Sequence, residues 1–332
     1  MKAIVILLLS LITLSCSIER VPDQRTVYLV TVADDFYNFN GNGRKLENVV
    51  TDSAAINMQL ETLGEVHTMC FISEEGKRYT SSNPTFVPKD KNGNELSDPS
   101  SPLFRRFSYK PKEGEEESGW TVRDVMEYLG KIEADEDDII IFTYSGHGEK
   151  KSGALMMNAS FSSYEWDSIS PEDFLDTITS LGGKKLVVLD SCYSGQYIPD
   201  SELISADKFA SGDKEDRWIG FDYPGTALST YIKGKKTERI KDLWIISASG
   251  KGQEASDNLS AGDGPFQEFY GAFTYYFLKA LGYDTDRNLP SGRDKHLTVF
   301  QIYSEIRSAF PDYETQIQTP RTYLKGLNLI LR

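Results

Sequence analysis

The chain has 332 residues, of which 39% are hydrophobic, so it can bury the core of one large domain or two ordinary ones. A formal net charge of -14 argues against binding to nucleic acid, which requires a basic face, and against electrostatic binding to anionic lipid. An acidic surface would attract basic substrates, although net negative charge also serves solubility.

The first sixteen residues predict export from the cytoplasm. Met1-Lys2 is a minimal positive start, and 4–14 is apolar apart from Ser10 and Thr13. The run is too short to span a bilayer comfortably and matches the apolar core of a secretory signal peptide. An N-terminal anchor helix that is never cleaved is the alternative.

Cys16 refines the expected location. A small residue, Ser15, precedes it at the end of the apolar run, and polar sequence follows at once. This pattern resembles the lipobox of bacterial lipoproteins, although Thr13 stands where Leu is usual. The resemblance implies that Cys16 is acylated and that the protein is a lipid-anchored lipoprotein of a bacterial cell envelope. Ordinary signal cleavage nearby is the other interpretation.

Beyond a short linker at 17–24, apolar strand-like runs alternate with stretches of helical periodicity. Strands are predicted at 26–32, 66–72, 138–144, 185–189 and 243–248, with a closing edge strand at 327–331; helices are predicted at 49–63, 121–132, 171–181, 267–281 and 297–310. Thr121 is the expected N-cap of one helix, and Ser170 with Pro171 opens another. This alternation predicts an α/β fold with a mostly parallel sheet between helices on both faces.

We expect residues 25–332 to form a single domain with two insertions. The segment 74–118 is rich in Gly, Pro, Ser, Lys and Glu, and 196–241 is polar and irregular. Such composition is typical of surface loops between regular elements.

Two of the predicted strands end in residues that carry chemistry. Phe142 to Gly148 places His147 between two glycines directly after an apolar strand. Leu186 to Gly195 leads from a second strand through Asp190 and Ser191 to Cys192. In parallel sheets the reactive groups lie at the carboxyl ends of the strands, so a nucleophilic role for this cysteine is favoured over that of an inert buried thiol.

His147 and Cys192 together predict a catalytic dyad. An imidazole can take the thiol proton or protonate a leaving amine, and backbone N–H groups after the histidine and at the cysteine can stabilise an oxyanion. The two residues follow strands that a single helical crossover would place side by side. Of the remaining cysteines, Cys70 is expected to be a buried core residue, although an exported chain could also pair it with Cys192.

The pair of motifs Tyr144-Ser145-Gly146-His147-Gly148 and Asp190-Ser191-Cys192-Tyr193-Ser194-Gly195 resembles the active-site motifs of caspase-like peptidases, above all metacaspases and bacterial caspase homologues. Weaker matches, such as Thr51-Asp52-Ser53-Ala54, extend the resemblance over most of 25–330. The family fold, a caspase-hemoglobinase α/β/α sandwich, agrees with the predicted alternation.

The resemblance implies a role for each matched position. Cys192 is the nucleophile, His147 the acid–base group, and the N–H groups of Gly148 and Cys192 the oxyanion hole. Acids equivalent to Asp52 and Asp190, with Ser145 close by, line a pocket for Arg or Lys in metacaspases.

The alternative is the aspartate preference of true caspases, which needs an arginine in that pocket. Arg44 lies shortly before the pocket residue Asp52 and leaves the alternative open.

The family also raises two further expectations. Some metacaspases need calcium, and Glu172, Asp173 and Asp200 lie in comparable regions with poorly matching spacing. No cofactor is therefore expected to be required, and calcium dependence is the alternative. The Lys and Arg residues within 196–241 also allow self-cleavage in this segment. The other interpretation is that the segment is simply a charged loop.

The resulting prediction is a cysteine endopeptidase acting on proteins or peptides, whose membrane contact is its lipid anchor. A non-catalytic, lipid-anchored binding protein on a caspase-like scaffold is the main alternative. A cysteine acyltransferase or ligase of the same fold is a third, and transfer to added amines would separate it from a hydrolase.

Overall fold

The computed structural model describes the parts of the chain in which the predicted motifs lie. The described residues are 25–35, 46–74, 77–79, 86–88, 105–107, 119–158, 166–198, 242–250, 252–257, 270–285, 290–291, 298–310, 321–324 and 331. The predicted signal peptide with Cys16, the linker 17–24 and most of both predicted insertions therefore lie outside the described residues. Within the described ranges, no helix has the length and apolarity needed to cross a bilayer.

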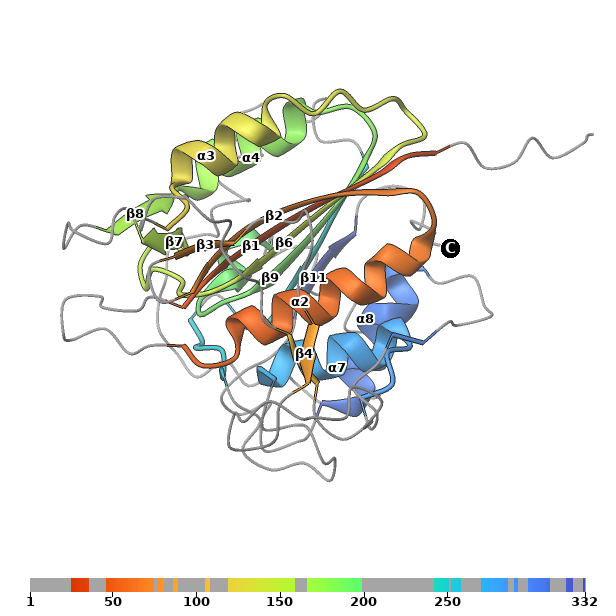
Figure 1. The fold of residues 1–332 in the computed structure, drawn as a ribbon. Coiled ribbons are helices and arrows are strands. Elements are labelled where there is room, and N and C mark those ends of the chain that lie inside the picture. The colour runs from red at the N-terminus through yellow and green to blue at the C-terminus, as the bar shows by residue number, and fades with distance from the viewer. Residues whose placement is uncertain are drawn as a thin grey trace, which may run out of the picture.

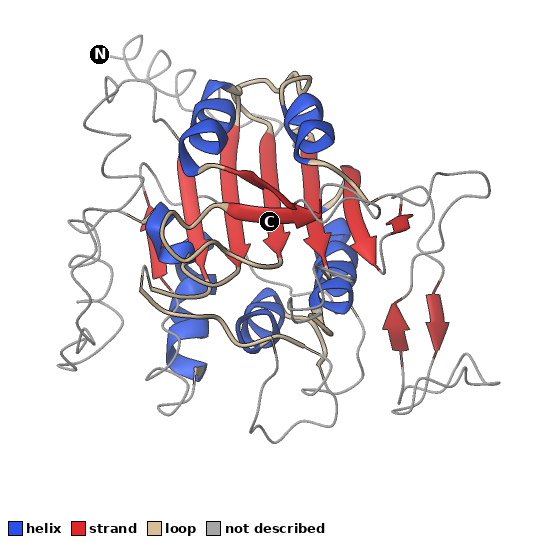
Figure 2. Cartoon of the chain, turned by 90° about the vertical axis from the view of Figure 1, so that its left-hand side faces the viewer, coloured by secondary structure: helices blue, strands red, loops and turns tan. Residues whose placement is uncertain are grey.

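A seven-stranded sheet in the order β11-β10-β9-β6-β1-β2-β3 forms the centre of the molecule (Figure 2). Its strands are β1 (Val27–Asp34), β2 (Val66–Glu74), β3 (Lys77–Tyr79), β6 (Ile139–Ser145), β9 (Lys184–Asp190), β10 (Leu243–Ser247) and β11 (Arg321–Leu324). The five inner strands run parallel, and only the two edge strands, β3 and β11, are antiparallel to their neighbours. The carboxyl ends of β1, β6, β9 and β10 therefore meet at one edge of the sheet.

Helices cover both faces of this sheet (Figure 1). The helices are α2 (Val49–Leu60), α7 (Ala272–Leu281) and α8 (Val299–Ala309) on one face, and α3 (Val122–Leu129) and α4 (Pro171–Ser180) on the other. Two short helices of the 3-10 type, η1 (Glu61–Leu63) and η2 (Ser194–Tyr197), and two small ribbons, β4 (Phe86–Pro88) with β5 (Arg105–Phe107) and β7 (Leu155–Asn158) with β8 (Trp166–Ile169), complete the described elements. The predicted α/β/α sandwich is confirmed.

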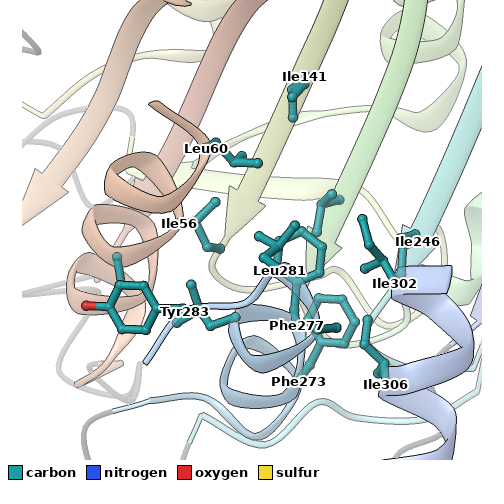
Figure 3. Close-up of a cluster of buried hydrophobic side chains, with 14 of the residues drawn as sticks. Ile56, Leu60, Ile141, Ile246, Phe273, Phe277, Leu281, Tyr283, Ile302 and Ile306 are labelled. Carbon is teal, nitrogen blue, oxygen red and sulfur yellow. The ribbon is translucent and has the colours of Figure 1, made fainter. Parts of the chain in front are cut away.

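Alternation along the inner strands builds a separate core on each face, because successive side chains of a strand point to opposite sides. In β6, Ile139 and Ile141 face α2, α7 and α8, whereas Ile140 and Phe142 face α3 and α4. Figure 3 shows the first core, in which Phe273 and Phe277 of α7 lie between residues of α2 and α8. Near-continuous apolar strands of this kind are expected where both faces of a parallel sheet are covered.

A chain of buried polar side chains crosses the first core and ties α2 to three strands. Thr143 of β6 donates to Thr31 of β1 over 3.2 Å, and the Thr31 hydroxyl donates to the side-chain oxygen of Asn57 in α2. The Asn57 amide in turn donates to the sulfur of Cys70 in β2 over 2.9 Å. Because each of these buried polar groups has a partner, this row of hydrogen bonds fixes the position of α2 on the sheet.

The helix caps agree with the sequence. Thr121 and Thr298 each form a capping box, and Ser170 caps α4 with Pro171 at its first position. Cys70 is 1% exposed and both Cys70 and Cys192 are free thiols, as the core interpretation of Cys70 requires.

Several elements differ from the sequence prediction, among them the short strands β3, β4 and β5 inside the predicted insertion 74–118. The closing edge strand lies at Arg321–Leu324, before the predicted 327–331, and residues 327–330 lie outside the described part. The helix predicted at 267–281 begins at Ala272, where the Ser256 carbonyl accepts the first free N–H. The β7–β8 ribbon was not predicted, since its strands are short and lack a clear turn signal.

Candidate active site

The carboxyl ends of β6 and β9 bring the two predicted motifs together. Ser145 pairs with Asp190 in the sheet register, and the Gly146 N–H donates to the Asp190 carbonyl over 3.2 Å. Ser145 is buried at 3% exposure, directly before the glycine-flanked histidine. His147 and Cys192 thus leave the sheet from adjacent strands, as the crossover argument predicted.

The backbone of His147 is held by its own loop. Its carbonyl oxygen accepts the Met156 N–H over 3.1 Å, and the Tyr144 hydroxyl lies within donating distance of the carbonyl oxygens of His147, at 2.7 Å, and Met156, at 2.6 Å. Burial raises the pKa of Tyr144 well above its ordinary value, and the nearby Asp34 raises it further, so this hydroxyl stays a donor. The half-buried imidazole is therefore carried by a fixed loop.

Gly148 brings the histidine loop against the cysteine loop. A Cβ atom placed on Gly148 would lie 1.9 Å from the carbonyl oxygen of Cys192 and 3.3 Å from the hydroxyl of Ser191. Real Cβ atoms do not approach backbone oxygen so closely, so only glycine allows the two loops to touch here. The close approach explains why this position is a glycine.

The thiol of Cys192 is half-buried and lies against the backbone of Ala255. The Ala255 N–H donates to the sulfur over 3.4 Å, and the thiol faces the Ala255 carbonyl oxygen at 3.8 Å. Burial raises the pKa of the Cys192 thiol, the Ala255 N–H lowers it, and the charges of Glu254 and Asp190 raise it. A thiol with a raised pKa is protonated at neutral pH, so its attack requires a base.

A tight turn after the nucleophile position connects it to the segment that follows β10. Tyr193 has a φ of 58°, which is the left-handed region that non-glycine residues rarely adopt. Its N–H donates to the Gln253 carbonyl over 2.8 Å, and its hydroxyl donates to Glu254 over 2.9 Å. These two hydrogen bonds stabilise the left-handed backbone conformation of Tyr193, which is unfavourable without such contacts.

Asp52 and Asp190 meet beside the N-terminus of α7. The Gly271 N–H donates to both carboxylate oxygens of Asp52 over 3.1 and 3.2 Å, and the Thr274 hydroxyl donates to Asp190 over 2.6 Å. A Cβ placed on Gly271 would lie 3.0 Å from an Asp52 oxygen and 3.1 Å from an Asp190 oxygen, so the two carboxylates face the same small space. The family resemblance had implied that these two acids lie together.

Both carboxyls carry strongly perturbed pKa values. Burial is the main cause that raises the pKa of Asp190 to about 7. The hydrogen bonds from Thr274 lower this pKa, and the charge of Asp257 raises it. Burial also raises the pKa of Asp52 well above its usual range, with Asp190 and then Asp257 adding to the effect. Clustered buried carboxyls of this kind are unfavourable unless a cation or protons neutralise them.

Asp257 is a third acid of this cluster, and sequence reasoning missed it. Its carboxylate accepts the backbone N–H groups of Glu47 and Asn48 over 2.8 and 3.4 Å, which anchors the start of α2. It lies ten residues beyond β10 in an irregular segment, so no periodicity or strand-end signal marks it. We define Asp52, Asp190 and Asp257 as the acidic pocket.

The remaining predicted positions fall elsewhere. Asp173 lies in the first turn of α4, where its carboxylate accepts the Ser170 hydroxyl over 2.6 Å, and Glu172 precedes it. Among the residues that the structure describes, no three side chains of ligand type gather to hold a metal ion. Arg44 and Asp200 lie outside the described residues.

Comparisons with known proteins identify the family. The model of the caspase domain, peptidase family C14, matches residues 37–328. The chain belongs to the caspase domain family. This family supports a cysteine peptidase-like role, and its match spans the histidine and cysteine loops and the acidic pocket.

Two solved structures show limited likeness to the chain. A protein of Geobacter sulfurreducens, GSU0716, is 14% identical with a TM-score of 0.46, over 90% of this chain and 92% of that chain. Caspase-1 of Spodoptera frugiperda is 10% identical with a TM-score of 0.46, over 90% of this chain and 86% of that chain. A search of curated proteins finds no match to the sequence.

Proposed function

We propose that this caspase-family chain is a cysteine endopeptidase in which Cys192 attacks the peptide bond and His147 transfers the proton. The observation that carries the proposal is the contact between the two loops, where Gly148 lies against the Cys192 carbonyl oxygen at the carboxyl ends of β6 and β9. The half-buried thiol with its raised pKa fits a nucleophile that is activated only when a base takes its proton.

The reaction would proceed in two steps. His147 accepts the thiol proton as the sulfur of Cys192 bonds to the scissile carbonyl carbon, and the imidazolium then protonates the leaving amine. Water, deprotonated by the same imidazole, hydrolyses the thioester and regenerates the thiol. The N–H groups of Gly148 and Cys192 would hold the oxyanion in both steps, and the glycine supports this role because it lets its backbone reach Cys192.

We further propose cleavage after Arg or Lys. The supporting observation is that Asp52 and Asp190 face one small space next to the nucleophile loop, with Asp257 raising the pKa of both. A guanidinium or ammonium entering this space would neutralise carboxylates that are otherwise costly to bury, and two oxygens can receive its N–H groups. An aspartate side chain would add another negative charge there.

The test is cleavage of fluorogenic peptides ending in Arg, Lys, Asp or Asn by the protein and by its Cys192→Ala variant, with and without calcium. We expect release after Arg and Lys that is lost in the variant. Release after Asp would support the catalytic dyad but would refute the proposal that the acidic pocket determines specificity. No release by a folded protein, with calcium present, would favour a binding protein or a precursor that awaits cleavage within 196–241.

The location remains a proposal from the sequence. We propose that the protein is exported and anchored through acylated Cys16, because the apolar run 4–14 ends in a lipobox-like pattern. Mass spectrometry of the N-terminal peptide after expression in a bacterium tests it. An unmodified Cys16, or a cleavage site elsewhere, would refute lipidation.

A further inference from the structure

An exposed carboxylate, that of Glu254, lies beside the proposed nucleophile and has no part in the mechanism described above. Successive residues of the segment 253–257 contact the turn at Cys192 and Tyr193. Gln253 accepts the Tyr193 N–H, Glu254 accepts the Tyr193 hydroxyl, and Ala255 contacts the Cys192 sulfur. Asp257 of the same segment belongs to the acidic pocket. The segment therefore lies directly against the proposed nucleophile and its turn.

The Glu254 carboxylate is held in place. Tyr193 is buried at 6% exposure, and its hydroxyl donates to one Glu254 oxygen over 2.9 Å. The backbone of Tyr193 is fixed by the Gln253 carbonyl and by its own left-handed conformation. An acceptor that is anchored before binding loses less side-chain freedom when a ligand arrives, which favours its use in recognition.

Glu254 also carries a charge that the described structure does not neutralise. The ion pairs found among the described side chains lie elsewhere, at His67–Glu65, Lys131–Glu127 and Lys184–Asp137. Glu254 is exposed, and its charge raises the pKa of the Cys192 thiol. For the nucleophile this charge is a disadvantage, because it disfavours the thiolate. An interaction with the substrate would explain why a carboxylate lies at this position.

We propose that Glu254 is a specificity-determining residue that binds a second basic side chain of the substrate, at a position neighbouring the residue that enters the acidic pocket. The proposal rests on the proposed peptidase function. The ligand class follows from the chemistry: an exposed, anchored carboxylate with one oxygen bound by Tyr193 leaves acceptor capacity for an ammonium or guanidinium. The favoured substrate is accordingly a peptide with paired or closely spaced basic residues.

The experiment uses the full-length protein and peptides with Arg before the cut. Lys, Ala or Glu is placed in turn at each neighbouring position on both sides of the cut. We expect at least one position where Lys gives a kcat/KM at least about fivefold higher than Glu, with the difference mainly in KM. In Glu254→Gln the preference should fall to near unity, and in the unchanged protein it should weaken as salt rises.

Two further variants sharpen the test. Tyr193→Phe removes the anchor of the carboxylate and keeps its charge, so the preference for Lys should weaken without disappearing. Glu127→Gln removes an exposed carboxylate on α3, far from the nucleophile in sequence and on another element, and should leave the preference unchanged. Alkylation of Cys192 by iodoacetamide across pH gives a readout free of peptide binding, in which Glu254→Gln should shift the rate profile to lower pH.

The outcomes separate this inference from the proposed function. A protein that cleaves after Arg with no preference at any neighbouring position, or with the same preference in Glu254→Gln, overturns the role of Glu254 and leaves the peptidase proposal standing. A protein that cleaves none of the peptides overturns both. An unchanged alkylation profile in Glu254→Gln would show that this carboxylate does not lie close enough to Cys192 for the proposed role.

Discussion

Asp190→Asn should stabilise the fold while it impairs cleavage after Arg. The amide keeps an oxygen that can accept the Thr274 hydroxyl, so the main change is the loss of a buried charge. The pKa of Asp190 is raised from 3.8 to about 7 in the folded protein. The folded state therefore binds the proton more tightly than the unfolded state does. Stability from this group is fully present below pH 3.8 and is lost as the pH rises through 7.

The size of the effect follows from the same shift. A change from 3.8 to about 7 is roughly three pKa units, or about 4 kcal/mol of unfolding free energy, of which about 3 kcal/mol is lost between pH 5 and pH 8. Relief of the neighbouring Asp52, whose pKa Asp190 raises, acts in the same direction. We expect the variant to exceed the unchanged protein by up to about 4 kcal/mol at pH 8, and by less than about 2 kcal/mol at pH 5.

Urea unfolding at pH 5 and pH 8, followed by tryptophan fluorescence, measures this difference. Asp137→Asn is a suitable control because its side chain is 93% exposed, and it should change stability by less than about 0.5 kcal/mol at either pH. In parallel, kcat/KM for an Arg peptide should fall at least about a hundredfold in Asp190→Asn. An Asp190→Asn protein that is no more stable at pH 8, or whose gain does not depend on pH, would refute the buried acidic pocket.

Three further predictions test other parts of the molecule. Gly148→Ala should lower kcat/KM at least about a hundredfold, because its Cβ would push the Cys192 carbonyl aside; an active variant would contradict the loop contact. Asn57→Leu should cost about 1–3 kcal/mol of unfolding free energy, because it leaves the buried Thr31 hydroxyl without its acceptor; unchanged urea unfolding would be inconsistent with this. The alkylation rate of Cys192 should rise with a midpoint above about 8.5, the value of a free cysteine, and a lower midpoint would count against a buried, protonated thiol.

Local sequence patterns were sufficient to predict the five inner strands of the sheet and the two loops. β6 and β9 are short apolar runs that end in Ser145 and Asp190, and the motifs of His147 and Cys192 follow at once. Such signals reside in a few consecutive residues, because side-chain periodicity reports burial and strand ends report where reactive groups lie. The helix caps, including Thr121, were readable for the same reason.

The edges of the fold were harder to predict. β11 lies at Arg321–Leu324, where it pairs antiparallel with β10, while the apolar run at 327–331 had suggested a strand a few residues later. β3 pairs with β2 inside a segment whose composition resembles a loop. Edge strands are short and are decided by their single neighbour, so composition alone indicates them poorly.

The sequence by itself determined the α/β alternation, the dyad candidates and the pairing of Asp52 with Asp190, the last through a family resemblance. Tertiary structure alone decided what surrounds them. Asp52 meets the N–H of Gly271 across 219 residues, and Asp190 meets Thr274 across 84. Asp257 and Glu254 reach the site on an irregular segment that no local pattern marks. Their roles arise because parallel strands gather distant segments at one edge, where burial and neighbouring charge set the chemistry of each group.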